Sequence, residues 1–260
     1  MPDPNRFLRG PFAPVEEELT VFDLPVTGSL PRRSSAPSYP ARPRRRPGPG
    51  LGATARKDSV MKAFSIVAAL ATAVQAVALI MLHLLPTGYN PVRDAVSDYG
   101  VGPYRGWFWL QAAAGGVGCL ALGIALAQLH PFTPTQVAVA LIVTAGARLL
   151  IPFFATDQDG SRFQTLHGTI HMILAVIAFG GLVWAATGLW STLSHYPAWH
   201  GAEGALTIIP WIMLGSVIAV VLAIAGPRLK PFFGIFERLF YLFSITWVLI
   251  VAIDLARISG

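Results

Sequence analysis

Two histidines four residues apart, His167 and His171, carry the most specific chemical signal in this sequence of 260 residues. On a helix, this spacing places both imidazoles on one face, as in helices that bind a metal ion. Asp157 precedes the expected helix, so it is available as a third ligand or as a carboxylate that orients a ligand histidine. The three residues are therefore candidate ligands of a divalent metal such as zinc, although the pattern lacks the glutamate of zinc proteases.

A second polar segment lies earlier in the chain, between Tyr89 and Gly100. Asn90 is a favoured helix N-cap and Gly100 a typical helix stop, so the segment predicts a short interfacial helix of about two turns. Asp94 and Asp98 would then lie on one face, where two carboxylates repel each other unless a cation or a shared proton lies between them. The same segment contributes two further candidates, Ser97 and Tyr99.

The composition indicates that these residues belong to a membrane protein. Hydrophobic residues make up 54% of the chain and charged residues 12%, whereas soluble proteins contain about 25% charged residues. The mean hydropathy is +0.58. With a single cysteine, these values exclude a soluble globular enzyme, a disordered chain and a disulfide-rich secreted domain.

Six apolar runs match the roughly 20 residues that an α-helix needs to cross a bilayer core of about 30 Å. They predict an all-α membrane protein, in which a domain at residues 61–258 forms a six-transmembrane-helix bundle. The expected spans are 63–85, 106–128, 137–154, 168–190, 206–225 and 235–255. Since alternate loops share one side of the membrane, we expect the polar residues of the first and third loops to form one site.

Arg148 lies inside the third expected span, where a charge is costly and normally faces a partner within the bundle. Asp157 or Asp98 is its expected partner, and Thr156 is a neighbouring candidate. Three interpretations remain open for this polar cluster. It is a salt-bridged plug that locks the helices, a site that handles a metal or protons, or a site that binds a lipid headgroup or a small solute.

Residues 1–60 form a leader rich in proline and arginine, and we expect this leader to be disordered. The first 62 residues hold 11 of the 19 Lys and Arg, which favours contact with the anionic inner leaflet of a bilayer and not with nucleic acid. The positive-inside rule then predicts a plasma or inner membrane protein with cytoplasmic N- and C-termini. The polar site would face the exterior.

The motifs resemble those of the DUF998 family of six-span membrane proteins, over residues 62–257. The resemblance rests on NPxxDxxSDYG in the first loop, on the pair Thr156 and Asp157, and on HGxxH at the start of the fourth span. It implies a multi-pass membrane protein without an established reaction. The family pattern gives weight to Ser97, Asp98, Tyr99, Gly100, Thr156, Asp157, His167, Gly168 and His171.

A second resemblance concerns residues 5–31, which are similar to the N-terminal lead-in of carotenoid cleavage oxygenases. That family needs an iron held by four histidines on a large β-propeller, and this chain has six histidines in total. We interpret the segment as a remnant without activity.

Three functions are compatible with the sequence. The first is a membrane protein whose exterior polar site binds an ion, a lipid headgroup or a small solute. The second is a metal-dependent hydrolase of lipid or amide bonds, which would resemble ceramidase-like enzymes, with His83 as a further ligand and Ser97 at the oxyanion. The third is a purely structural bundle.

Overall fold

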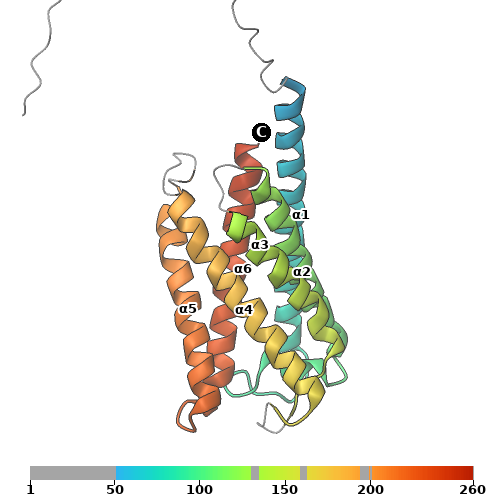
Figure 1. Ribbon diagram of the computed structural model, residues 1–260. Coiled ribbons are helices and arrows are strands. Elements are labelled where there is room, and N and C mark those ends of the chain that lie inside the picture. The colour runs from blue at the N-terminus through green and yellow to red at the C-terminus, as the bar shows by residue number, and fades with distance from the viewer. Residues whose placement is uncertain (1–50, 130–134, 159–162, 194–198, 200, 260) are drawn as a thin grey trace, which may run out of the picture. The chain divides into compact units, whose positions relative to one another are not determined.

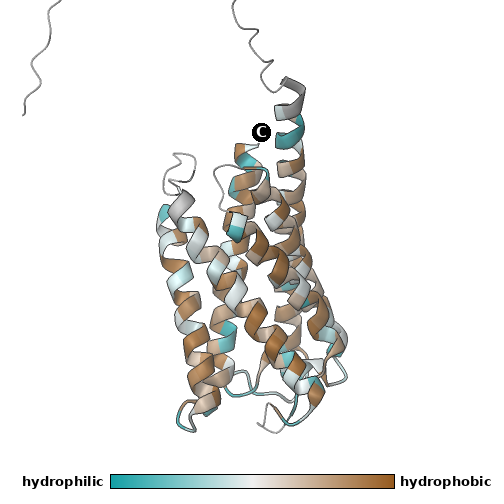
Figure 2. Cartoon of the chain, in the orientation of Figure 1, coloured by the Kyte–Doolittle hydropathy of each residue, from teal (hydrophilic) through white to brown (hydrophobic). Residues whose placement is uncertain are grey.

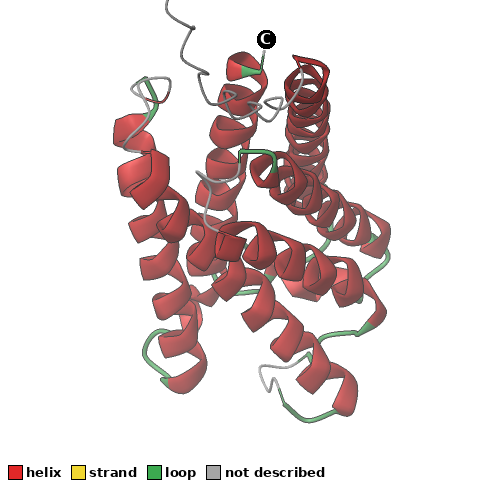
Figure 3. Ribbon diagram, turned by 45° about the horizontal axis from the view of Figure 1, so that its top comes forward, coloured by secondary structure: helices red, strands yellow, loops and turns green. Residues whose placement is uncertain are grey.

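The computed structural model of the chain describes residues 51–129, 135–158, 163–193, 199 and 201–259. The regular elements within these ranges are helices (Figure 3). Six of them are long and apolar enough to cross a membrane. The predicted all-α bundle of six transmembrane helices is confirmed. Most of the predicted leader lies outside the described residues, so its disorder stays a prediction.

The six long helices follow the predicted spans, with an earlier start of α1 and smaller shifts at the other ends. They are α1 (Leu51–Leu84), α2 (Arg105–Ala127), α3 (Thr135–Leu150), α4 (Leu166–Leu193), α5 (Glu203–Ala225) and α6 (Phe233–Ile258). Among the described residues, three short 3₁₀ helices lie between them, η1 (Val96–Gly100), η2 (Ile151–Phe153) and η4 (Lys230–Phe232).

Two boundaries differ from the prediction for reasons that the sequence explains. α1 begins within the predicted leader, because residues 51–62 contain no proline that would stop a helix. α3 ends before its expected end, because Pro152 disfavours the α conformation at the residue that precedes it. The chain continues from there as η2.

The helices form a ring in chain order. Each helix packs against the next one, α6 packs against α1, and α2 also contacts α6. Successive helices run in opposite directions, so the loops after α1, α3 and α5 lie at one end of the bundle. The start of α1 and the end of α6 lie at the other end (Figure 1). We call the end of the bundle that holds the loops after α1, α3 and α5 the loop end.

Hydrophobic side chains cover the outside of the bundle as well as its interior. Phe179 of α4 stacks on Phe240 of α6 inside, with ring centroids 4.1 Å apart. On the outside, Leu70, Val176 and Trp211 are more than 60% exposed. Figure 2 shows hydrophobic residues along the helices and hydrophilic residues mainly near helix ends and in loops. Such an exterior suits a hydrocarbon surrounding, in which exposed apolar groups have no cost.

Candidate functional site

Three connecting segments meet at the loop end (Figure 1). Loop 1 (residues 85–104) contains η1, loop 3 (residues 151–165) begins with η2, and loop 5 (residues 226–232) contains η4. The polar candidates of loops 1 and 3 therefore lie at the same end of the bundle, as the alternation of spans predicts.

Loop 1 folds as two short turns. The Asp94 Oδ2 atom accepts a hydrogen bond from the backbone N–H of Asn90 at 2.8 Å. The Asp98 Oδ2 atom accepts one from the N–H of Ala95, also at 2.8 Å. Carboxylates that bond to nearby backbone N–H groups compete with helix formation. The predicted two-turn interfacial helix is therefore wrong, and η1 is the helical part of this loop.

The first carboxylate of loop 1 also has a cationic neighbour. The Arg93 Nε atom donates to Asp94 Oδ1 at 2.8 Å. This hydrogen bond lowers the pKa of Asp94 below its ordinary value. The Arg93 side chain is 67% exposed, and exposed ion pairs contribute only about 0–1 kcal/mol to stability.

Loop 1 is held on α6 by two adjacent charged residues, Glu237 and Arg238. The Glu237 carboxylate is buried, and its Oε2 atom accepts a hydrogen bond from the N–H of Val96 at 2.7 Å. The Arg238 Nη1 atom donates to the carbonyl of Asp94 at 2.8 Å, and its Nη2 atom to the Tyr99 hydroxyl at 3.1 Å. Loop 1 is therefore fixed at both ends of its second turn.

Close backbone contact makes this attachment possible. A side chain at Gly234 would meet the carbonyl oxygens of Pro91 and Asp94 at 2.5 and 2.6 Å. The N–H of Ile235 donates to the carbonyl of Val92 at 3.1 Å. Glycine is needed here because loop 1 lies directly on the start of α6.

His83 of α1 belongs to the same hydrogen-bond network. Its Nδ1 atom lies 2.7 Å from the carbonyl of Leu79, which can only accept, so we assign the ring proton to Nδ1. Its Nε2 atom accepts from Arg238 Nε at 2.6 Å. Both ring nitrogens are thus used within the protein, and the prediction that His83 is a metal ligand is not supported. Sequence reasoning did not select Glu237 or Arg238 as part of the site. The signal that could have found them is an adjacent acid and base at the start of an apolar run.

Asp157 of loop 3 organises the start of α4. Its Oδ1 atom accepts from the Thr165 hydroxyl at 2.6 Å, and Oδ2 accepts from the backbone N–H of Gln164 at 2.9 Å. The Thr165 hydroxyl in turn accepts from the N–H of Gly168 at 3.0 Å, as an N-cap does. These bonds, that from Thr165 foremost, lower the pKa of Asp157. A side chain at Gly168 would overlap the carboxylate, which explains the glycine of HGxxH.

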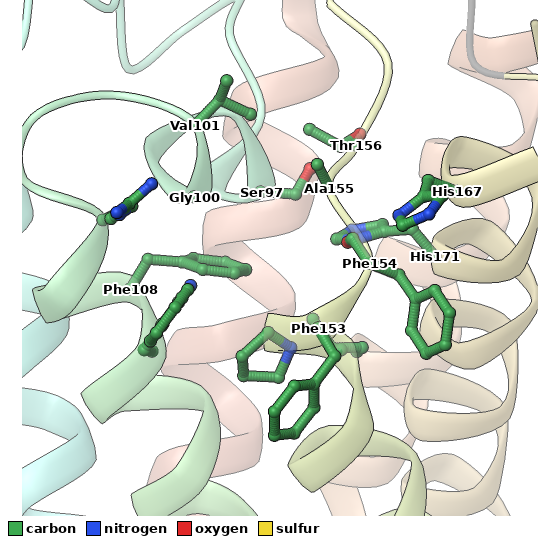
Figure 4. Close-up of a pocket in the computed structure, with 14 residues that line it drawn as sticks. Ser97, Gly100, Val101, Phe108, Phe153, Phe154, Ala155, Thr156, His167 and His171 are labelled. Atoms are coloured by element: carbon green, nitrogen blue, oxygen red, sulfur yellow. The ribbon is translucent and has the colours of Figure 1, made fainter. Parts of the chain in front are cut away.

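A cavity of about 200 Å³ lies between loop 1, loop 3 and the starts of α2 and α4. Ser97 and Thr156 are buried at its wall, and Thr156 Oγ has no hydrogen-bond partner in the part of the chain that the structure describes. His167 and His171 line it from α4, and Arg105 from α2. Figure 4 shows these hydroxyls and imidazoles together with the aromatic rings that complete the lining. The aromatic residues are Phe108, Trp109, Phe153 and Phe154. We call this space the Thr156 cavity.

His171 is fixed by the backbone of loop 3. Its side chain is 3% exposed, and its Nδ1 atom lies 2.8 Å from the carbonyl of Phe154. A carbonyl can only accept, so we assign the proton of the neutral ring to Nδ1. This contact holds the imidazole at the wall of the Thr156 cavity.

The acids of the predicted site line a different space. A cavity of about 860 Å³ lies between loops 1, 3 and 5, and its lining includes Asp94, Asp98 and Asp157. The Gln158 Nε2 atom donates to the Tyr89 hydroxyl at 3.0 Å and so joins loop 3 to loop 1 there. The prediction of one polar site is thus replaced by two neighbouring cavities, with acids around one and hydroxyls and imidazoles around the other.

Arg148 lies deeper in the bundle and is 3% exposed. Its Nη2 atom is 3.5 Å from the Gln111 Oε1 atom, and its Cζ atom lies 5.6 Å from the centre of the Tyr241 ring. A side chain at Gly115 would overlap its guanidinium. Among the described residues it forms no ion pair, so the predicted bond to Asp157 or Asp98 is wrong. A neutral amide and an aromatic ring take the place of the acid.

The predicted metal ligands are not assembled. Among the residues that the structure describes, no group of three or more His, Cys, Asp and Glu side chains is close enough to hold a metal ion. The Asp157 carboxylate caps α4, and the His171 Nδ1 atom bonds to a carbonyl. Asp157 and His171 therefore have structural contacts, and His167 lines the Thr156 cavity.

A comparison with known protein families matches the part of the chain that contains these motifs. The family model described as "Protein of unknown function (DUF998)" matches residues 56–254. The chain belongs to the DUF998 family. This family assignment confirms the resemblance drawn from loops 1 and 3. Searches of the curated proteins and of the solved structures returned no match. The similarity of residues 5–31 to carotenoid cleavage oxygenases is not supported, and that segment lies outside the described residues.

The capping role of Asp157 gives a pH-dependent prediction. Because folding lowers the pKa of Asp157, its carboxylate stabilises the folded state above the ordinary pKa of 3.8, and this stabilisation is lost as the pH falls through the lowered value. Asp157→Asn is therefore expected to reduce the melting temperature at pH 7 in detergent, with the difference from wild type shrinking below pH 4.

Asp58→Asn, at an exposed position near the start of α1, is the control and should leave the melting temperature unchanged at either pH. A difference for Asp157→Asn that stays the same from pH 7 to pH 3 would show that the carboxylate charge does not stabilise this cap.

Proposed function

We propose that this protein is a membrane-embedded binding protein whose Thr156 cavity takes the polar headgroup of a lipid or a small solute. The observation that supports this most directly is the Thr156 hydroxyl. The residue is 6% exposed and its Oγ has no partner. Burying an unpaired hydroxyl costs about 1–3 kcal/mol. A bound polar group would supply the missing partner.

The lining of the cavity supports a ligand that is polar at one end. Hydroxyls and imidazoles occupy one part, and aromatic rings occupy the rest. Binding sites commonly combine an apolar wall with a few polar groups that set orientation. Phe153, which is 71% exposed, lies at the rim, so a headgroup would enter with its apolar chains outside.

The alternative functions have less support. A metal-dependent hydrolase needs a ligand set, and the described residues do not bring one together. A purely structural bundle gives no reason for a cavity lined by two hydroxyls, two imidazoles and a guanidinium. The binding function is therefore the best supported of the three.

The membrane and the orientation are part of the same proposal. We place the protein in the plasma or inner membrane with both ends of the chain in the cytoplasm and the loop end outside. The support is the cluster of arginines ahead of α1, which the positive-inside rule retains in the cytoplasm.

Cysteine labelling tests this orientation. Cys119 is buried and 3% exposed, so Arg228→Cys, in loop 5, supplies the reactive thiol. We expect a membrane-impermeant maleimide to label this variant on intact cells. Labelling that requires permeabilisation would place the loop end in the cytoplasm and overturn the orientation. Wild type is the control.

Thr156→Val tests the binding function. The change removes the hydroxyl at nearly constant shape, so without ligand the purified protein should be as stable as wild type or about 1–2 kcal/mol more stable. Ligand binding should weaken about three- to tenfold, because one hydrogen bond is lost. The measurement is the thermal shift produced by host polar lipid extract and by glycerol, glucose, choline and phosphate.

Thr144→Val is a matched control. Thr144 Oγ is also buried without a partner, but it is not part of the cavity lining. This variant should gain stability as Thr156→Val does and keep the ligand response of wild type. An equal response of all three proteins to every probe would mean that nothing binds at the Thr156 cavity.

A further inference from the structure

We infer that the group bound in the Thr156 cavity is a phosphate-type anion, either free or as the phosphate of a lipid headgroup. This inference rests on the proposed function and names its ligand class. The polar side chains of the described lining are two hydroxyls, two imidazoles and one guanidinium, and no Asp or Glu is among them. The neighbouring cavity of about 860 Å³ is lined by three aspartates, together with Arg93 and Lys230.

Arg105 supplies the positive charge. It is the first residue of α2, and its Cζ atom lies 5.7 Å from the centre of the Trp109 ring. Among the described residues it has no ion-pair partner, in contrast to Arg93, which is bound to Asp94. A guanidinium with its charge uncompensated at a cavity favours a phosphate or carboxylate, which it can bind through two parallel hydrogen bonds.

Two long helices begin at this cavity. Arg105 opens α2, a helix of 23 residues, and His167 is the second residue of α4, a helix of 28 residues. The N-terminal end of a helix carries a partial positive charge. α3 ends at the same cavity, and the carbonyl of Phe154 beyond it already accepts from His171. Because the Asp157 carboxylate already caps the start of α4, the start of α2 is the helix end that adds to the positive potential of Arg105.

The Thr156 hydroxyl is an independent indication of the ligand. Thr156 is more than nine-tenths buried and lines the cavity, and its Oγ has no partner among the described residues. A hydroxyl there can donate to an anionic oxygen, and Ser97 offers a second hydroxyl. Phosphate has several acceptor oxygens, so it can use the hydroxyls and the guanidinium together.

The volume limits the size of the bound group. About 200 Å³ corresponds to roughly six or seven water molecules at about 30 Å³ each. A phosphate or a small headgroup fits such a space, but acyl chains do not. A lipid would therefore insert its phosphate alone, past the exposed rim at Phe153.

The experiment measures binding to the full-length protein in two arms. In the first, inorganic phosphate and glycerol 3-phosphate are titrated into detergent-purified protein. In the second, the protein is placed in nanodiscs of neutral lipid with or without a phosphomonoester lipid. Arg105→Gln should weaken binding about ten- to a hundredfold, because it removes a charge-assisted contact. Arg228→Gln, which removes the same charge from loop 5, should change affinity less than twofold.

Binding in either arm that depends on Arg105 and Thr156 supports the inference, and the responding arm identifies a free or a lipid phosphate. If glucose or choline binds in a Thr156-dependent way and neither phosphate arm responds, the inference is wrong while the binding function stands. If no probe binds, both fail. Should Arg105→Gln be unstable, Arg105→Lys keeps the charge but loses the fork of two hydrogen bonds, so it should still weaken binding about three- to tenfold, and unchanged affinity would contradict the role of Arg105.

Discussion

The structure depends on one constraint, which is that polar groups at or below the membrane surface must find partners within the protein. At the loop end this is met by Glu237 and Arg238 of α6, which bond to the backbone and a hydroxyl of loop 1. Because His83 of α1 accepts a further hydrogen bond from Arg238, the same network joins the first and last helices of the ring. Loop 1 therefore has a fixed position over the bundle.

That fixed position creates the two cavities. Ser97, Gly100 and Val101 of loop 1 line the Thr156 cavity, while Asp94 and Asp98 line the larger one. The acids of the family motifs form hydrogen bonds that stabilise turns and a helix cap. Asp94 and Asp98 do so within loop 1, and Asp157 caps α4. Among the described residues, three buried side-chain polar atoms have no partner, Thr144 Oγ, Arg148 Nε and Thr156 Oγ, and of these three residues Thr156 lines the cavity. This contrast is the reason for placing the ligand at Thr156 and not among the acids.

The spans could be predicted from sequence, because the length of an apolar run and the thickness of a bilayer decide them. The start of α4 at HGxxH and its cap by Asp157 could also be predicted, since Asp157 lies only a few residues before this helix in the chain. Loop 1 could not be predicted, because Asp94 and Asp98 bond to their own backbone and α6 supplies the rest. The partner of Arg238 lies 139 residues away at Tyr99. Arg148 was misassigned because a glutamine and an aromatic ring, not an acid, surround it.

The most direct test of this account is hydrogen exchange of loop 1 in Arg238→Lys, compared with Arg228→Lys. Lysine keeps the charge but cannot reproduce the fork of hydrogen bonds. We expect the amides of residues 96–101 to exchange about tenfold faster or more in Arg238→Lys, which corresponds to about 1.4 kcal/mol of lost local stability. Arg228→Lys should match wild type. Unchanged exchange in Arg238→Lys would contradict the central claim that α6 holds loop 1 in place.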